Sequence, residues 1–287
     1  MNAVVKNTGN KYSNHLSFPT GIPSADDNAI YCPLPRQRGF KLAALHINKL
    51  TTHIDELRIL LDENPIDILA INETKLDDNV SDNEVHLSGY EIIRRDRTSG
   101  GGGGVCFYVR SGINYKVRSD LNILDLENLC IEINKPRSTP FLVNTWYRPP
   151  NSPVSIFASL EILIGKLDSM NVEYFLLGDL NCDQTAVIPD NNTNLMNNIS
   201  DIYGLTQLIK EATRITENTA TLLDFIYTNH PDRIACSGVS HVGISDHSLV
   251  YAYRKLSIGP PNKGHSTILI ANSKISILMH FALILHL

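Results

Sequence analysis

Short apolar runs separated by polar segments dominate the chain between residues 40 and 256. Runs of this length that are rich in β-branched and aromatic residues predict strands. The predicted strands cover residues 40–47, 66–71, 89–94, 105–109, 129–133, 141–146, 174–177, 205–209, 223–227, 238–242 and 249–253. Helical spacing of apolar residues predicts helices at residues 52–63, from Ser152-Pro153 to Leu167, and at residues 195–203. Because strands dominate, we expect packed sheets with helices on their outer faces.

The two ends of the chain differ from this central part. Residues 1–39 are rich in Asn, Ser, Pro and Gly without apolar periodicity, which predicts a flexible arm. After residue 256, Gly259-Pro260-Pro261 interrupts structure, and the apolar run at residues 275–287 is shorter than the roughly 20 residues that span a bilayer. We therefore expect one folded domain at residues 40–256 and a divergent apolar tail at residues 257–287.

The composition of the chain excludes few classes of protein. A chain of 287 residues with 43% hydrophobic residues can bury a large core. The net charge of −5 does not indicate a nucleic-acid-binding protein, although a metal in an acidic pocket would reverse the local sign. Five widely spaced cysteines without a CxxC pair indicate reduced thiols, and the N-terminus shows no secretory signal. We expect an intracellular protein.

Polar residues occur where several distant apolar runs begin or end. These sequences are Ile71-Asn72-Glu73-Thr74, Gly178-Asp179-Leu180-Asn181, Leu223-Asp224-Phe225 and Ser245-Asp246-His247-Ser248. Ligands in open α/β sheets collect beyond the carboxyl ends of strands, so these segments predict one assembled pocket. Such an acidic, oxygen-rich pocket suits Mg²⁺, which takes one or two carboxylates and leaves its other positions to water and phosphate.

Each candidate also has an ordinary structural explanation. Glu73 is either a metal ligand or a loop acid. Alternation along an extended segment would place Asp179 and Asn181 on one side, where they could share a phosphate, although an Asx-turn after a strand is equally simple. His247 needs a group that fixes its tautomer, and Asp224 is a better candidate than the adjacent Asp246.

Two further segments are candidates for contacts with phosphate. Tyr147 ends a predicted strand, and its phenol could donate a hydrogen bond to phosphate. Residues 100–104 are all glycine, but no GK[ST] follows, so we interpret them as a flexible hairpin loop. Arg94 and Arg97 lie beside this loop, where they form either a solvated face or a contact with a DNA backbone.

In this order, the runs resemble the endonuclease/exonuclease/phosphatase superfamily, which contains apurinic endonucleases and pancreatic deoxyribonuclease. Residues 71–75, 94–104, Tyr147-Arg148-Pro149-Pro150-Asn151, residues 178–183 and Ser245-Asp246-His247-Ser248 look most like endonucleases of LINE-type, non-LTR retrotransposons. The resemblance covers residues 40–256. It implies a four-layer α/β sandwich of two mixed sheets flanked by helices, and Mg²⁺-dependent nicking of double-stranded DNA that leaves a 3′-hydroxyl.

The resemblance also implies a role for each matching residue. Glu73 would be the principal metal ligand, with Asn48 near the metal and Asp246 as a further acid of the metal site. Asp179 would position or activate the attacking water. The remaining implied roles are phosphate binding by Asn181 and Tyr147, and orientation of His247 by Asp224 so that the imidazole contacts the scissile phosphate. Mn²⁺ could replace Mg²⁺, and the implied location is the nucleus. No membrane association or oligomer is indicated.

Two positions depart from the family pattern. His46 stands where the family commonly has asparagine; a histidine can still donate to phosphate, but it is bulkier and titrates near neutrality. Pro150 occupies the place of the asparagine that usually follows the tyrosine, and Asn151 comes next. Two other functions stay open: a phosphomonoesterase or phospholipid hydrolase of the same fold, and an inactive retroelement remnant with at most weak DNA binding.

Overall fold

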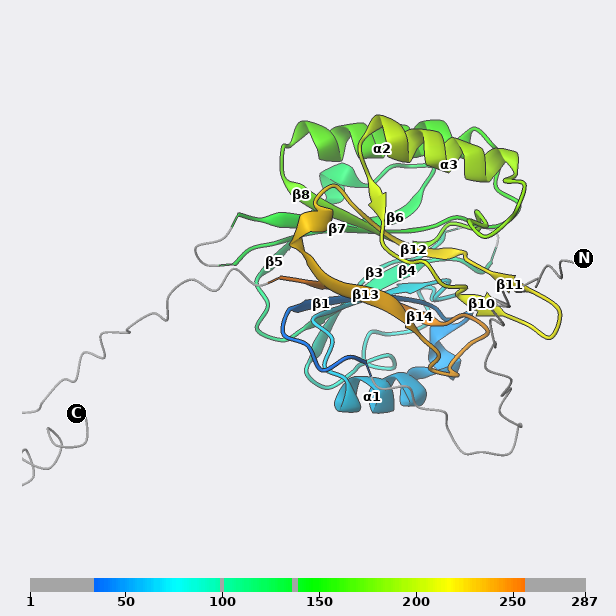
Figure 1. The fold of residues 1–287 in the computed structure, drawn as a ribbon. Helices are drawn as coiled ribbons and strands as arrows, with labels where there is room; N and C mark the ends of the chain where they lie inside the picture. Colours follow the sequence, from blue (N-terminus) through cyan, green and yellow to red (C-terminus); the bar gives the residue numbers. More distant parts are fainter. Residues whose placement is uncertain (1–33, 99–100, 136–138, 256–287) are drawn as a thin grey trace, which may run out of the picture.

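Two six-stranded sheets pack face to face in the computed structural model, which describes residues 34–98, 101–135 and 139–255 (Figure 1). The first sheet has the order β13 (Ile234–Ser240), β14 (Leu249–Arg254), β1 (Phe40–His46), β2 (Ile68–Asn72), β4 (Val105–Arg110) and β3 (Tyr90–Arg95). The second has the order β5 (Tyr115–Val117), β6 (Glu127–Ile133), β7 (Phe141–Tyr147), β8 (Glu173–Asp179), β12 (Asp224–Thr228) and β9 (Thr206–Gln207). Both sheets are mixed, since β1 pairs with β2 and β7 with β8 in parallel, whereas the other pairs are antiparallel.

Helices cover the outer face of each sheet and complete four layers (Figure 1). Helix α1 (Ile54–Glu63) lies on the first sheet, and α2 (Ile156–Ser169) and α3 (Asn191–Ile202) lie on the second. The shorter elements are η1 (Leu50–Thr52), η2 (Ser119–Leu121), η3 (Pro231–Arg233) and a hairpin of β10 (Arg214–Ile215) and β11 (Ala220–Thr221). The predicted sandwich of two mixed sheets with outer helices is confirmed.

Strand β2 shows how the sequence separates two cores. Ile68 and Ala70 face the core between the sheets, whereas Leu69 and Ile71 belong to the core beneath α1. Successive residues of a strand point to opposite faces, so a strand that is covered on both sides reads as a continuous apolar run. The amphipathic spacing of α1 brings Leu57 and its neighbours Leu60 and Leu61 into the second of these cores.

One edge of the sandwich collects the polar residues that interrupt the apolar runs. Strands β1, β2, β7 and β8 end at this edge, and the antiparallel strands β14 and β12 begin there. The register places His46 opposite Asn72 and Asp224 opposite Asp179. The segment before β14 therefore lies beside the segment after β1, and the segment before β12 lies beside the segment after β8. Segments that are far apart in the sequence thus come together at this edge.

Some element boundaries differ from the sequence prediction. Helix α2 begins at Ile156, whereas the prediction had Ser152 as the cap and Pro153 as the first helical residue. The Ser152 hydroxyl instead donates to the Pro149 carbonyl at 2.8 Å and closes a turn before the helix. The strand predicted at residues 205–209 is only β9, two residues long. The short β5 and the β10–β11 hairpin carry too few residues to show an apolar alternation.

The ends of the described region add two facts. Leu34 is buried in the core beneath α1, and its N–H donates to Asn64 Oδ1 at 3.1 Å. Residues 1–33 of the predicted arm and the predicted tail at residues 257–287 lie outside the described residues. Across the ranges that are described, none of the helices has both the length and the apolar character needed to cross a bilayer. Cys106, Cys130, Cys182 and Cys236 form no disulfide.

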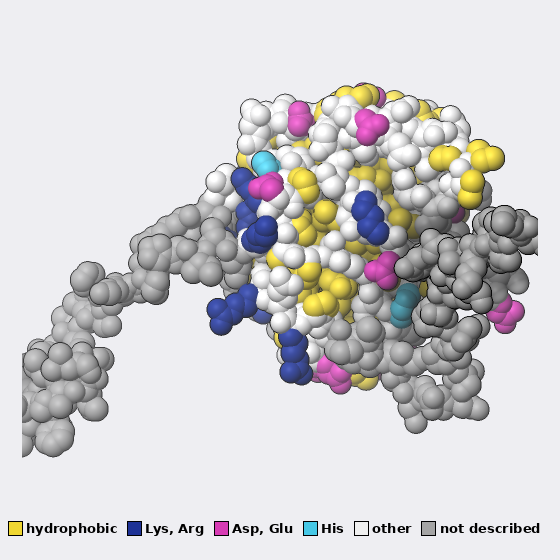
Figure 2. Space-filling view, viewed as in Figure 1, with side chains coloured by type: hydrophobic (Ala, Val, Ile, Leu, Met, Phe, Trp, Pro, Cys, Tyr) yellow, Lys and Arg dark blue, Asp and Glu magenta, His cyan; other side chains and the backbone are white. Residues whose placement is uncertain are grey.

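Figure 2 shows most of the Lys and Arg side chains in view along the left side of the face, with Asp, Glu and His side chains near some of them and one further basic side chain near the centre. Hydrophobic and uncharged side chains form most of the middle of this face.

Candidate active site

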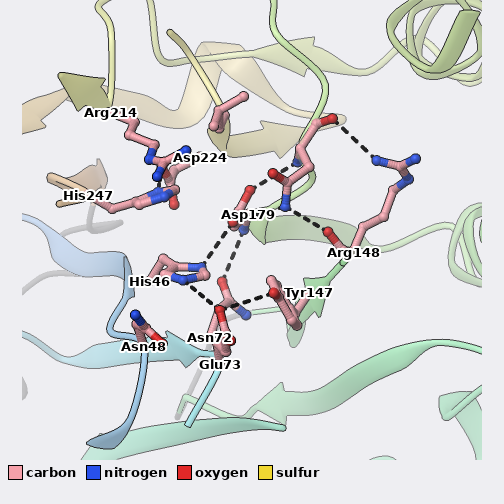
Figure 3. A network of polar contacts seen from close by, with 12 residues as sticks. His46, Asn48, Asn72, Glu73, Tyr147, Arg148, Asp179, Arg214, Asp224 and His247 are labelled. Atoms are coloured by element: carbon pink, nitrogen blue, oxygen red, sulfur yellow. Dashed lines mark hydrogen bonds and ion pairs between the residues drawn. The ribbon is translucent and has the colours of Figure 1, made fainter. Parts of the chain in front are cut away.

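The edge described above holds a connected network of polar side chains (Figure 3). Its central members come from the ends of β1, β2, β7 and β8, from the start of β12 and from the segment before β14. The labelled residues that form the centre of the candidate site are His46, Glu73, Tyr147, Asp179, Asp224 and His247. The four segments predicted from sequence to form one pocket thus lie together.

The backbone holds Glu73 in an unusual conformation. Its φ is 54°, in the left-handed region that non-glycine residues rarely adopt. The Glu73 carbonyl accepts a hydrogen bond from Lys49 N at 3.0 Å, and Thr74 exchanges backbone hydrogen bonds with Leu50 and Gly104. Surrounding hydrogen bonds that enforce a strained residue are common at functional sites. The carboxylate therefore has a fixed position after β2.

Three neighbours contact the Glu73 carboxylate. His46 Nε2 lies 2.9 Å from Oε2, Tyr147 donates its hydroxyl to Oε2 at 3.1 Å, and Lys75 Nζ lies 3.2 Å from Oε1. The contact with His46 is the main reason that the pKa of Glu73 falls to about 2, even though burial opposes this shift. Glu73 is therefore anionic at neutral pH.

His46 lies between the two sheets' carboxylates (Figure 3). Its Nε2 faces Glu73 on the first sheet, and its Nδ1 lies 2.9 Å from Asp179 Oδ2 on the second. Burial alone would lower the pKa of His46, but the contacts with Asp179 and Glu73 outweigh burial and raise the pKa to about 10. The imidazole also stacks on His247, with ring centroids 4.3 Å apart and an angle of 20° between planes.

Asp179 is almost completely buried, with 1% of its surface exposed. Burial raises the pKa of its carboxyl, while the contact with His46 works in the opposite direction. Asn181 N donates to Asp179 Oδ1 at 2.9 Å, which is an Asx-turn, and the φ of Asn181 is 48°. The extended alternation expected for Asp179 and Asn181 is therefore wrong: the strand ends at Asp179, and the turn brings the Asn181 amide to 3.2 Å from Asp179 Oδ2.

Asn72 and Gly178 hold the two sheets together beside Asp179. Asn72 Oδ1 accepts from the backbone N–H of Asp179 at 3.0 Å, and Asn72 Nδ2 donates to Thr145 Oγ1 at 3.1 Å. A Cβ on Gly178 would lie 2.2 Å from the Trp146 carbonyl oxygen and 2.8 Å from Asn72 Oδ1. Only glycine permits this approach at a φ of 135°. Asp179 is thus positioned by both sheets.

His247 is fixed by a buried carboxylate. Its Nδ1 lies 2.7 Å from Asp224 Oδ2, and the exposed fractions of these residues are 5% and 1%. Thr213 Oγ1 accepts from Asp224 N at 3.1 Å, and Ser245 Oγ accepts from His247 N at 3.1 Å while donating to the His46 carbonyl. Because the Asp224 contact engages Nδ1, the other ring nitrogen, Nε2, is the one left for a ligand or substrate.

Arg148 supports the loop that follows β8. Its guanidinium donates to the carbonyls of Leu180 and Asn181 at 3.3 and 3.2 Å, and Asn181 Nδ2 donates back to the Arg148 carbonyl at 2.8 Å. The Arg148 side chain also lies over the Phe157 ring, 5.3 Å from its centroid. Arg148 therefore fixes the loop that carries Asn181.

The outer members of the site are more exposed. Asn48 Oδ1 accepts from Lys75 Nζ, so this ammonium group lies between Asn48 and Glu73. Asp246 pairs with Arg214, whose Nε lies 2.8 Å from Asp246 Oδ2, and this contact helps to lower the pKa of Asp246 against the opposing effect of burial. Arg214 is also bridged to His247 through the backbone.

The arginines predicted to contact DNA have different surroundings. Arg97 Nε donates to Glu127 Oε1 at 2.7 Å, and a Cβ on Gly102 would contact both Arg97 and Glu73. Arg94 instead donates to Asp96 and to carbonyls of the loop at residues 77–82. Asn151 is exposed in the turn that precedes α2.

Sequence reasoning missed several supporting residues. These are the buried polar residues Asn72, Thr145, Thr213 and Arg148, which contact the candidate site residues or one another. A polar residue at the end of an apolar strand, as Asn72 is, was a usable signal because buried polar groups need partners. Arg148, which directly follows the apolar strand β7, carries the same signal, whereas Thr213 does not, since its neighbours in sequence do not predict burial.

Comparisons with known proteins agree with the architecture. The model of the endonuclease/exonuclease/phosphatase family matches residues 44–247. No curated protein sequence matches the chain. The endonuclease domain of TRAS1, a telomere-specific non-LTR retrotransposon, is similar at a TM-score of 0.63 and 15% identity, over 76% of this chain and 99% of that chain.

Two other solved structures are also similar. An AP endonuclease from Archaeoglobus fulgidus has a TM-score of 0.60 and 16% identity, over 76% of this chain and 100% of that chain. A 3′ phosphatase from Neisseria bound to a product DNA hairpin has a TM-score of 0.58 and 17% identity, with the same coverage. At these identities the likeness establishes the fold. Because the family model covers well over half of the 287 residues, the chain belongs to the endonuclease/exonuclease/phosphatase family of hydrolases.

Proposed function

We propose that this protein is a divalent-metal-dependent endonuclease that hydrolyses DNA phosphodiester bonds by direct attack of water. The observation that carries the proposal is the convergence of Glu73, Asp179 and the Asp224–His247 pair at one edge of the sandwich. An anionic oxygen donor, a buried acid and an oriented imidazole are the groups that such a reaction needs.

The oxygen donors of Glu73 and Asn48 fit a hard cation. Lys75 Nζ already contacts an oxygen of each, so a positive charge is accommodated between them. Mg²⁺ takes oxygen ligands and keeps several waters, and Mn²⁺ can replace it. Glu73 and Asn48 would hold the ion, with Asp246 as a further acid at the rim. When bound, the ion would offset negative charge on the phosphoryl oxygens.

Asp179 is the proposed base that accepts a proton from the attacking water. Its carboxyl is buried and has a raised pKa, which makes it a better proton acceptor than an exposed aspartate. Asn181 Nδ2 donates to the Asp179 carboxylate, and the Asp179 backbone N–H donates to Asn72 Oδ1, so both bonds help to position the residue. His46 contacts the same carboxylate and also contacts Glu73.

His247 and Tyr147 are the proposed donors to the phosphate. Asp224 engages Nδ1 of His247, so Nε2 is free to contact a phosphoryl oxygen. The pKa of Tyr147 is raised by burial and by nearby Glu73, so its hydroxyl stays protonated and can donate. Asn181 would add an amide donor. No covalent intermediate is needed, because water attacks phosphorus in line.

DNA of a target site is the proposed substrate. The Tyr147-Arg148-Pro149-Pro150-Asn151 segment and the glycine loop are the features that favour the retrotransposon branch of the family. Arg97 and Arg214 provide cationic groups at the rim, and Asn151 would add a polar contact. A nick that leaves a 3′-hydroxyl could then prime reverse transcription, and action in the nucleus stays a prediction.

Supercoiled plasmid incubated with the purified chain and Mg²⁺ tests the proposal. We expect nicked circles, and a loss of roughly 10²–10⁴-fold in rate for Glu73→Ala and for His247→Ala. Glu211→Ala and His230→Ala, which remove the same residue types elsewhere, should leave the rate unchanged. Equal nicking by the wild type and both site variants would reject the assignment.

A panel of other substrates and a DNA-binding measurement separate the two alternatives. Release of phosphate from a 3′-phosphorylated DNA end or an inositol phosphate, or of phosphocholine from sphingomyelin, without nicking of the plasmid, would favour the phosphatase or phospholipid hydrolase. Salt-sensitive DNA binding without cleavage in Mg²⁺ or Mn²⁺ would favour an inactive remnant.

A further inference from the structure

We propose that His46, Asp179 and His247 form a binding site for a divalent transition metal ion, represented by Zn²⁺. Each of the three residues offers one ligand atom, and these atoms all lie within 4.8 Å of one another. The site differs from the hard-cation position at Glu73 and Asn48, because two of its three ligands are nitrogen.

The geometry is close to that of a metal-bound set. His46 Nδ1 lies 2.9 Å from Asp179 Oδ2, and the three ligand atoms all lie within 4.8 Å of one another. A tetrahedral Zn²⁺ with bonds of about 2.0–2.1 Å holds its ligand atoms roughly 3.4 Å apart. Binding therefore requires the widest separation to shorten by up to about 1.4 Å, and the His46 and His247 rings, which stack at an angle of 20°, to turn so that both nitrogens point at the ion.

Both histidines have a carboxylate on the opposite ring nitrogen. Asp224 contacts Nδ1 of His247, which leaves Nε2 for a metal, and Glu73 contacts Nε2 of His46, which leaves Nδ1. Metal-binding histidines almost always donate their other N–H to a carboxylate, a carbonyl or water. Each of the two proposed ligand histidines therefore has the carboxylate partner that metal-bound histidines usually have.

His46 Nδ1 is buried and faces the Asp179 carboxylate at 2.9 Å. A metal ion at this position would replace the proton that lies between this nitrogen and Asp179, because a ligand histidine must be deprotonated.

The ligand types select the metal. Imidazole nitrogen suits Zn²⁺, Co²⁺ and similar ions, whereas Mg²⁺ prefers oxygen ligands. An asparagine at position 46 would leave one imidazole and one carboxylate, so His46 is the residue that changes the preference. Occupancy of the site would withdraw Asp179 and His247 from the proposed hydrolysis, although metal binding itself does not depend on that activity.

Titration of the chelator-treated full chain with Co²⁺ and Zn²⁺, in the presence of excess Mg²⁺, tests the inference. We expect the visible absorption of a Co²⁺ ion with nitrogen ligands, which Zn²⁺ abolishes and Mg²⁺ does not. His46→Asn should lose this absorption, His230→Asn should retain it, and Asp224→Asn should weaken binding by about 10–100-fold.

X-ray absorption of the Zn²⁺-loaded wild type provides a test that needs no variant to fold. Two imidazole ligands per ion support the proposal, and one or none overturns it. Wild-type Co²⁺ affinity and spectrum in a His46→Asn chain that is folded by circular dichroism would also overturn it. Plasmid nicking is measured separately, so failure of the nuclease assignment leaves these binding results interpretable.

Discussion

Replacing Asn72 with alanine should cost more stability than any surface change in this chain. Asn72 is fully buried and makes two hydrogen bonds, one to the backbone N–H of Asp179 and one to the Thr145 hydroxyl. Both bonds cross from the first sheet to the second. Asn72→Ala would leave both partner groups buried without their bonds to Asn72.

The expected magnitude follows from these two groups. An unsatisfied buried donor or acceptor costs about 1–3 kcal/mol, and the Thr145 hydroxyl can rotate to reduce its share. We therefore expect Asn72→Ala to lower the free energy of unfolding by about 3 kcal/mol, which corresponds to roughly 6–12 °C in Tm for a domain of this size. Thr145→Val removes only the second bond and should cost about 1 kcal/mol.

Urea unfolding and thermal unfolding of the three proteins provide the measurement. Asn218→Ala, at an exposed position in the β10–β11 hairpin, serves as the matched control and should stay within about 0.5 kcal/mol of the wild type. A cost below about 1 kcal/mol for Asn72→Ala, with unchanged nicking, would refute the claim that Asn72 joins the sheets and positions Asp179.

Three further predictions concern pH and local geometry. The pKa of His46 is raised from 6.5 to about 10, so the stability that the charged imidazole adds to the fold is complete below pH 6.5 and is lost as the pH rises to about 10. The pKa of Glu73 is lowered from 4.5 to about 2, so the stability that its carboxylate adds is lost as the pH falls below 4.5. The difference in unfolding free energy between wild type and His46→Asn, measured in chelator, should therefore peak between pH 4.5 and 6.5 and shrink on both sides; a flat difference would contradict the ionic contacts. Gly178→Ala should cost at least about 2 kcal/mol in urea unfolding because its Cβ would clash with a carbonyl, whereas Gly204→Ala, also at positive φ but in open space, should cost about 1 kcal/mol. Asp190→Ala should cost about 1 kcal/mol by thermal unfolding, because Asp190 accepts from Thr193 N as the cap of α3, and a change below about 0.3 kcal/mol would show that the cap is dispensable.

The strands that cross the middle of each sheet could be predicted from sequence because both of their faces are buried. Residues 40–47, 141–146 and 174–177 are long apolar runs, and β1, β7 and β8 lie at those places. Strands β9, β10 and β11 are each two residues long and depend on pairing with a neighbouring strand. The local pattern of apolar residues does not encode such pairing. The start of α2 was misplaced because a Ser-Pro pair fits a turn as well as a helix cap.

Much of the candidate site could be located in the sequence for the same reason. Glu73, Asp179 and His247 stand at the boundary between an apolar run and a loop, so their positions at a sheet edge follow from the strands. Their partners depend on the packing of one sheet on the other. The link from His46 to Asp179 joins residues that are far apart in sequence and belong to different sheets, and no local pattern specifies it.

Asn72 and His46 each link the two sheets at the edge that holds the site, and the two links respond differently to pH. The bond from Asn72 to the Asp179 N–H joins neutral groups, so its strength does not depend on protonation. His46 instead joins Glu73 and Asp179 through charge, and the raised pKa of its imidazole shows how strongly the carboxylates hold that proton. Above about pH 10 the His46 link loses its charge while the Asn72 link persists. The sheets should therefore stay paired in alkali, because Asn72 holds the backbone of Asp179 and the apolar core joins the two sheets. The Asp179 carboxylate then keeps its hydrogen bonds from Asn181, and the Glu73 carboxylate keeps its contacts with Tyr147 and Lys75.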